Sequence, residues 1–158
     1  MDLPSAYWHV HMEKSLTPKT AFEDPPRKYE MLRMPFGLRN SQATQQRLMD
    51  QVLNGVTDTS TYVDNILSHS THFDEHLATL KEIFERLHQG NLNLRLDKSE
   101  FAREEVEQFG FTIDAMGLRP TDNGIVKLNQ YPRPTSMKEV KRFLGMANYY
   151  QGVCSQIF

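Results

Sequence analysis

Thr61-Tyr62-Val63-Asp64-Asn65-Ile66-Leu67 is an apolar run interrupted once, by a carboxylate and an amide. The β-branched and aromatic residues on both sides favour β-strands, and the Asp-Asn pair favours the positive-φ corner of a tight hairpin. The stretch therefore predicts a β-hairpin with Asp64 and Asn65 at its corner. Such a hairpin is either a plain surface turn or a support that holds the Asp64 carboxylate where it could bind a metal ion.

The composition is that of an ordinary globular domain. Of the 158 residues, 39% are hydrophobic and 24% are charged, and the net charge is −2, which argues against strong non-specific nucleic-acid binding. The single cysteine, Cys154, excludes an internal disulfide and a cysteine-based zinc site. We therefore predict an intracellular protein, cytoplasmic or nuclear. No apolar run approaches the roughly 18 residues that cross a bilayer, so no membrane partner is expected.

Hydrophobic periodicity predicts four helices, over residues 42–53, 72–88, 122–131 and 136–151. Ser136 and Glu139 are spaced as a capping box for the last of them. Strands are predicted around residues 7–12, 20–22, 29–34 and 107–114. His9 and His11 alternate with apolar residues in the first strand, where they are either a solvated face or, with a third ligand, a metal pair.

This order of elements predicts an α+β domain, in which an antiparallel sheet packs on two main helices and a helical tail follows. Between residues 119 and 142 basic side chains outnumber acidic ones. The basic residues there are Arg119, Lys127, Arg133, Lys138, Lys141 and Arg142, and the acidic ones are Asp122 and Glu139. The segment is either a phosphate-facing surface or a solvated helix face.

Several segments, in this order, carry a family pattern. They are Asp2-Leu3-Pro4-Ser5-Ala6-Tyr7, Met34-Pro35-Phe36-Gly37-Leu38, Tyr62-Val63-Asp64-Asn65, Phe109-Gly110-Phe111 and Phe143-Leu144-Gly145-Met146-Ala147-Asn148-Tyr149-Tyr150. Together they resemble the palm and the start of the thumb of a reverse transcriptase, the RNA-directed DNA polymerase of gypsy-type long-terminal-repeat retrotransposons. The resemblance implies a palm over residues 1–115, without fingers or a first palm strand, and a thumb-like helical tail over residues 116–158.

The resemblance also implies a catalytic centre. Nucleotidyl transfer uses two divalent ions that clamp the attacking and leaving oxygens, and hard cations of this kind take oxygen ligands. By resemblance, Asp2 and Asp64 are the metal ligands and Asn65 occupies a third catalytic position. The expected cofactor is Mg²⁺ or Mn²⁺, and the expected partners are an RNA or DNA template-primer and a dNTP.

Further roles follow from the same resemblance. The Leu3 carbonyl would add a backbone ligand, and Tyr7 would be a steric gate beneath the sugar. Phe36 and Gly37 would flank the incoming base. Two more residues, Phe109 and Gly110, would form the primer grip.

Two departures from the family pattern weaken the expected catalytic centre. Asn65 stands where the family has a second aspartate, so the site has one negative charge fewer. Asp2 is preceded only by Met1, so we expect it to fray, leaving a sheet edge beside the Tyr62 strand that favours self-association. In addition, Gln45 replaces the usual aromatic residue, and Ser99 replaces the usual cysteine.

We therefore expect a retrotransposon-derived reverse transcriptase fragment that is inactive as a free chain and binds nucleic acid weakly. Two alternatives stay open. One is a working polymerase subunit that uses Asp2 and Asp64, with fingers supplied by another chain. The other is a non-enzymatic adaptor on the palm fold that binds nucleic acid or a protein through its sheet edge or basic tail.

Overall fold

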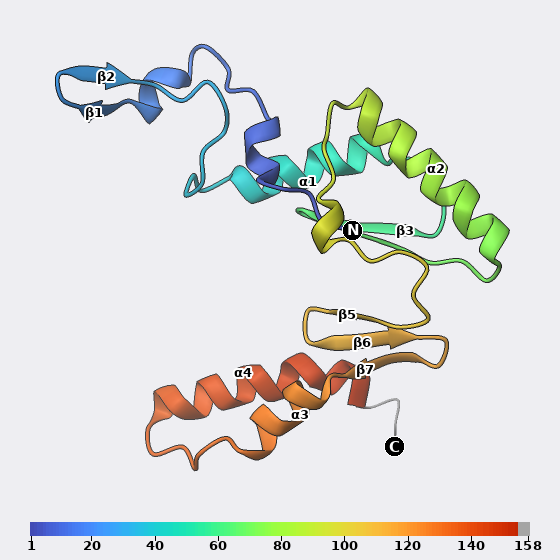
Figure 1. The fold of residues 1–158 in the computed structure, drawn as a ribbon. Helices are drawn as coiled ribbons and strands as arrows, with labels where there is room; N and C mark the ends of the chain where they lie inside the picture. Colours follow the sequence, from blue (N-terminus) through green and yellow to red (C-terminus); the bar gives the residue numbers. More distant parts are fainter. Residues whose placement is uncertain (155–158) are drawn as a thin grey trace. The chain divides into compact units, whose positions relative to one another are not determined.

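The structure, a computed structural model, describes residues 1–154 and divides into two compact units (Figure 1). Unit 1 is Met1–Ala102, and unit 2 begins at Arg103. Unit 1 contains η1 (Ala6–His9), η2 (Thr17–Thr20), β1 (Phe22–Asp24), β2 (Arg27–Tyr29), α1 (Ser41–Val52), β3 (Thr59–Tyr62), β4 (Asn65–Ser68), α2 (Phe73–Gln89) and η3 (Leu96–Lys98). Unit 2 contains β5 (Val106–Gln108), β6 (Phe111–Asp114), β7 (Gly117–Pro120), α3 (Asp122–Asn129) and α4 (Met137–Cys154).

The β3–β4 hairpin lies at the centre of unit 1. The two strands pair antiparallel from Thr59 opposite Ser68 to Tyr62 opposite Asn65. Helix α1 packs against β3 and helix α2 against β4. One apolar core joins the hairpin, both helices and the start of the chain, and its buried members are Leu3, Ala6, Met49, Leu53, Val56, Ile66, Ile83, Leu87 and Leu92.

The predicted strand at residues 7–12 is wrong. Ala6–His9 is a 3₁₀ helix, η1, and only His11 makes a β-bridge, to Arg33. The rings of Tyr7 and Trp8 both pack on Phe36, with ring centroids 5.2 Å and 6.4 Å away. Consecutive side chains of a strand point to opposite faces, so the shared partner requires a helical turn instead.

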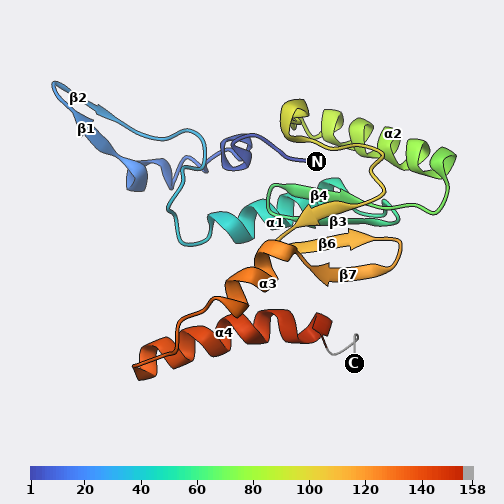
Figure 2. The ribbon, with the colours of Figure 1, turned by 60° about the horizontal axis from the view of Figure 1, so that its bottom comes forward.

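The β1–β2 hairpin projects from the rest of unit 1 (Figures 1 and 2). The ring of Phe22 stacks on that of Tyr29 at 5.6 Å, and the residues of both strands are exposed. The strands predicted at residues 20–22 and 29–34 are thus shifted, because pairing occurs at residues 22–24 and 27–29.

Unit 2 is a three-stranded antiparallel sheet, in the order β5-β6-β7, with two helices. The strand predicted over residues 107–114 is divided in two by a turn at Phe109–Gly110, and β7 was not predicted. Helix α4 packs on β7, and its Tyr149 and Tyr150 rings lie 5.1 Å and 5.3 Å from the Phe111 ring.

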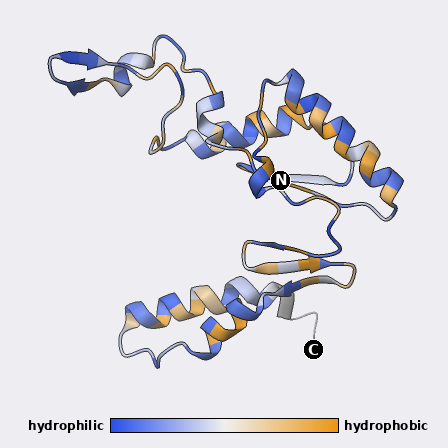
Figure 3. Cartoon of the chain, in the orientation of Figure 1, coloured by the Kyte–Doolittle hydropathy of each residue, from blue (hydrophilic) through white to orange (hydrophobic). Residues whose placement is uncertain are grey.

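The predicted α+β class is confirmed, and the four predicted helices are present with small shifts at their ends. Within residues 1–154 the strands form three small antiparallel sheets. Polar and apolar residues alternate along α2 and α4, as expected of amphipathic helices (Figure 3). No helix within residues 1–154 is long and apolar enough to cross a membrane.

Candidate active site

Asp2 lies beside strand β4, directly opposite Asn65, in an antiparallel β-bridge. Its chain neighbours make the flanking backbone hydrogen bonds, since Leu3 N donates to Asp64 O (2.9 Å), Ile66 N to Met1 O (3.0 Å) and the Met1 nitrogen to Ile66 O (2.9 Å). The start of the chain thereby lies alongside the β3–β4 hairpin, next to β4 rather than next to the Tyr62 strand.

The backbone of Asp2 is also held on its other side. Its N–H donates to the Ser99 hydroxyl at 3.2 Å, and its carbonyl accepts from Arg95 N at 2.9 Å. The Ser99 hydroxyl in turn donates to the Arg95 carbonyl at 2.8 Å. The expectation that Asp2 frays is therefore wrong, because hydrogen bonds from the hairpin and from Arg95 and Ser99 hold its backbone on both sides.

The corner of the hairpin is Val63–Asp64 rather than Asp64–Asn65, because Tyr62 pairs with Asn65. Val63 has a φ of 56° and is buried. A left-handed conformation costs a non-glycine residue about 1–2 kcal/mol, and a β-branched residue adopts it rarely. The prediction of a positive-φ corner at Asp-Asn is therefore wrong by one residue, because the register of the ladder leaves Val63 and Asp64 in the turn.

Asn65 is a neighbour of both aspartates, through the β-bridge to Asp2 and a hydrogen bond to Asp64. Directly opposite residues of an antiparallel pair share a face, with Cβ atoms about 4.5–5.5 Å apart, so Asn65 and Asp2 are neighbours on one face. The Asn65 amide Nδ2 donates to Asp64 Oδ1 at 3.0 Å. An aspartate at position 65 would instead face two carboxylates, so the asparagine stabilises this arrangement without a metal ion.

The side chains at this site offer the type of ligand that a divalent ion prefers, but they include too few carboxylates. Asp2 and Asp64 offer hard carboxylate oxygens, and Asn65 offers a neutral amide oxygen. Within residues 1–154 no group of three or more histidine, cysteine, aspartate or glutamate side chains could hold a metal ion. His9 and His11 accordingly gain no further ligand there. The roles predicted for Asp2, Asp64 and Asn65 stay predictions.

An aromatic group gathers around Phe36, one of the predicted nucleotide-binding residues. The Tyr7 and Trp8 rings both meet Phe36 edge to face, and Phe36 is 61% exposed. Gly37 has a φ of 88°, which explains the glycine. The side chain of Leu3 is buried in the core. These residues stay candidates for nucleotide binding, and the structure adds Trp8 to them.

In unit 2, Phe109 and Gly110 form the two-residue turn between β5 and β6. Both have positive φ, 53° and 79°. The Tyr149 hydroxyl donates to the Phe109 carbonyl at 2.6 Å, and this hydrogen bond connects the turn to helix α4. The predicted primer grip is thus a well-defined turn, while its contact with a primer stays a prediction.

Three residues that sequence reasoning did not assign to the site lie in it or hold it, namely Trp8, Gln46 and Ser99. Ser99 was visible only as a departure from the family pattern. Gln46 gave no signal, because its partners Val63 and Thr61 are distant in the sequence. Electrostatics adds one effect at the chain start, where burial lowers the pKa of the Met1 amino group and the nearby Asp2 carboxylate opposes this.

A family model described as reverse transcriptase (RNA-dependent DNA polymerase) matches residues 1–113. The chain belongs to the reverse transcriptase family. Among curated relatives, the retrovirus-related Pol polyprotein from transposon opus of Drosophila melanogaster is 39% identical over 153 residues, which cover 96% of the chain and 15% of that polyprotein. The transposon Tf2-7 polyprotein of Schizosaccharomyces pombe is 34% identical over 151 residues, which cover 94% of the chain and 11% of that polyprotein.

The predicted relationship to long-terminal-repeat retrotransposons is confirmed, and the transposon gypsy polyprotein of Drosophila melanogaster is 31% identical over 153 residues, covering 96% of the chain and 15% of that polyprotein. The reverse transcriptase chain thus spans a small part of each relative. A foamy viral protease-reverse transcriptase in complex with double-stranded DNA is similar in structure, with a TM-score of 0.85 and 29% identity over 94% of this chain and 26% of that one. The same enzyme with an RNA/DNA hybrid gives a TM-score of 0.79, again at 29% identity, over 94% of this chain and 20% of that one.

Proposed function

We propose that this chain is the palm and the start of the thumb of a retrotransposon reverse transcriptase, and that as a free chain it does not polymerise DNA. The observation that carries the proposal is the pairing of Asp2 with Asn65, next to Asp64, in a member of this family. Two carboxylates and an amide share one end of the β3–β4 hairpin. One further carboxylate would be needed to match the family pattern.

Asp2 and Asp64 are the residues that would hold Mg²⁺ or Mn²⁺. Such ions supply charge stabilisation to the attacking and leaving oxygens of nucleotidyl transfer. Asn65 lowers the negative charge that attracts them, and its Nδ2 occupies a lone pair of the Asp64 carboxylate. The Leu3 carbonyl, Tyr7, Phe36 and Gly37 would then line the dNTP site. Metal binding in the free chain is expected to be weak, because Asn65 contributes no negative charge.

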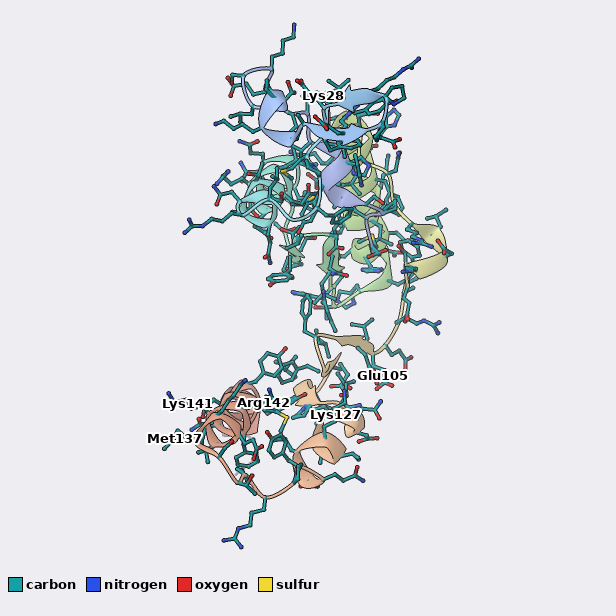
Figure 4. All side chains as sticks on the ribbon, turned by 90° about the vertical axis from the view of Figure 1, so that its left-hand side faces the viewer. Lys28, Glu105, Lys127, Met137, Lys141 and Arg142 are labelled. Carbon is teal, nitrogen blue, oxygen red and sulfur yellow. The ribbon has the colours of Figure 1, made fainter. Side chains whose placement is uncertain are left out.

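Template-primer is the proposed partner. The foamy viral relatives were solved with double-stranded DNA and with an RNA/DNA hybrid. In unit 2, Lys127 on α3 and Lys141 and Arg142 on α4 are exposed (Figure 4), and cations of this kind bind phosphates in a salt-dependent manner. Phe109 and Gly110 would support the primer backbone.

The domain assignment follows the family resemblance, with the palm over residues 1–115 and the thumb from residue 116. The compact units divide earlier, after Ala102, so the β5-β6-β7 sheet belongs structurally with the thumb-side helices. Self-association through the edge of β3 is a further proposal, because β4 is the only strand paired with β3 among the described residues. Size-exclusion chromatography over a range of concentrations tests it.

A primer-extension assay with Mg²⁺ and with Mn²⁺ tests the proposed inactivity. The chain is expected to give no templated product above an Asp64→Ala control, and clear product would overturn the proposal. The proposed metal ligands are tested separately by Mn²⁺ titration. Asn65→Asp should bind Mn²⁺ about tenfold more tightly, since affinity rises with ligand charge, but it should not restore extension. Equal Mn²⁺ affinity in Asn65→Asp, the native chain and Asp64→Ala would refute the assigned ligands.

A further inference from the structure

The turn that carries Asp64 is held in a conformation that its own residues disfavour. Val63, one residue before Asp64, is β-branched and has a φ of 56°. A backbone in this region persists only where the surrounding structure fixes it. The β3–β4 ladder closes the turn at the Tyr62–Asn65 pair, and a further contact to the turn itself comes from helix α1.

Gln46, on helix α1, holds the hairpin through both ends of its amide. Its Oε1 accepts from the Val63 backbone N–H at 2.8 Å. Its Nε2 donates to the Thr61 carbonyl at 3.2 Å and to the Thr61 hydroxyl at 3.1 Å. A single side chain therefore contacts the last part of β3 and the first residue of the turn.

The orientation of this amide is set by Asp50, one helical turn further along α1. Gln46 Nε2 donates to Asp50 Oδ1 at 2.8 Å. Since an ionised carboxylate only accepts hydrogen bonds, it fixes the NH₂ end of the amide on its side and leaves the oxygen facing the Val63 N–H. Neither a glutamate, which lacks the donors, nor an apolar residue, which lacks both functions, reproduces this pattern.

We propose that Gln46 is a positioning residue that fixes the Val63 turn and thereby the direction of the Asp64 carboxylate. The part of this inference that concerns metal binding rests on the proposed function of Asp64. The part that concerns the turn stands on the hydrogen bonds alone. Gln46 acts through Val63 and Thr61 and touches no reacting group.

Amide hydrogen exchange followed by NMR tests the turn directly. In Gln46→Met the Val63 amide should exchange at least tenfold faster than in the native chain, whereas the amide of Ile66, which bonds to Met1 O, should change less than twofold. Gln46→Glu keeps an acceptor but loses both donors and places a carboxylate against Asp50 Oδ1 and the Thr61 carbonyl, so its Val63 amide should also exchange faster than in the native chain. Gln51→Met, at an exposed position of the same helix, is the matched control and should leave both amides unchanged.

Two results would overturn the proposal at this stage. One is a Val63 amide that exchanges at the native rate in Gln46→Met, and the other is a Val63 amide that exchanges at the native rate in Gln46→Glu. If Gln46→Met does not fold, Asp50→Ala takes its place. It removes the group that orients the amide and should speed exchange at Val63 severalfold, and an unchanged rate there would refute the inference.

Mn²⁺ binding, measured by water-proton relaxation, tests the link to Asp64. Gln46→Met should weaken binding about threefold to tenfold relative to the native chain, and Asp64→Ala should remove it. Faster exchange at Val63 with unchanged Mn²⁺ affinity would mean that Gln46 holds the turn without positioning Asp64, and would overturn the proposal. If the native chain and Asp64→Ala bind Mn²⁺ equally, the proposed metal ligands fail, while the exchange result still decides the role of Gln46 in the turn.

Discussion

Replacing Gln45 with methionine should stabilise unit 1. Gln45 lies on the inner face of α1, one turn from Ser41 and Met49, and its exposed fraction is 0%. Neither its Nε2 nor its Oε1 has a hydrogen-bond partner. The family pattern has an aromatic residue here, so the polar amide occupies a position made for an apolar side chain.

The magnitude follows from the amide alone. A buried polar group without a partner costs about 1–3 kcal/mol in proteins. Methionine has nearly the same length and shape, is flexible enough to fit without overpacking, and has a helix propensity close to that of glutamine. Gln45→Met should therefore raise the free energy of unfolding of unit 1 by about 1–3 kcal/mol. For a urea m-value of roughly 1–2 kcal/mol/M, the midpoint should rise by about 1 M.

The single tryptophan makes the assay specific to unit 1. Trp8 is 40% exposed and packs on Phe36, so its fluorescence reports the unfolding of unit 1 in urea. Gln51→Met, at an exposed position of the same helix, is the control and should change stability by less than about 0.5 kcal/mol. A midpoint for Gln45→Met that is equal to or below that of the native chain would refute the reasoning, because it would mean that the Gln45 amide is satisfied when buried.

Three further predictions concern the turns and the last helix. Gly37→Ala should destabilise unit 1 by about 1–2 kcal/mol through its φ of 88° alone, since a Cβ there would meet nothing within 4 Å. Gly145→Ala, in α4 and with the same open space around its Cβ, should instead stabilise its helix by about 0.5–1 kcal/mol. Equal effects of the two substitutions on the free energy of unfolding in urea would contradict this. Tyr149→Phe removes the hydroxyl that donates to the Phe109 carbonyl and should cost unit 2 about 0.5–1.5 kcal/mol. Its control is Tyr131→Phe, whose ring packs on Phe143, and a loss no larger than that of the control would remove the Tyr149 bond as the cause. Hydrogen bonds from the Thr135 backbone and hydroxyl lower the pKa of the Glu139 carboxyl, so its contribution to α4 is present above the ordinary glutamate pKa of about 4.3 and is lost as the pH falls through the lowered value. Circular dichroism should show this loss of helix on acidification in the native chain and not in Glu139→Gln, and identical acid titrations of the two chains would contradict the assignment.

The amino-acid sequence by itself determined the helices and the family. Leu77, Leu80, Phe84 and Leu87 recur at helical spacing, and the main helix they predict is present as α2. The Ser136 hydroxyl accepts from Glu139 N as the capping box requires, and the Glu139 carboxylate accepts from the Thr135 N–H and hydroxyl. Local patterns of this kind suffice because helix periodicity and capping depend on residues a few positions apart.

Only the tertiary structure decided how the candidate active site is held. Asp2 is fixed by Ser99 and Arg95, and Gln46 fixes the Val63 turn. These partners lie from 17 to 97 positions away in the chain, and nothing in the local sequence around either aspartate marks them. The hairpin was predictable because strand and turn propensities are local. Its corner was misplaced by one residue because the register of the β3–β4 ladder, which pairs Tyr62 with Asn65, leaves Val63 and Asp64 in the turn. The sequence therefore specifies which chemical groups the site contains, and long-range hydrogen bonds and burial specify where they lie.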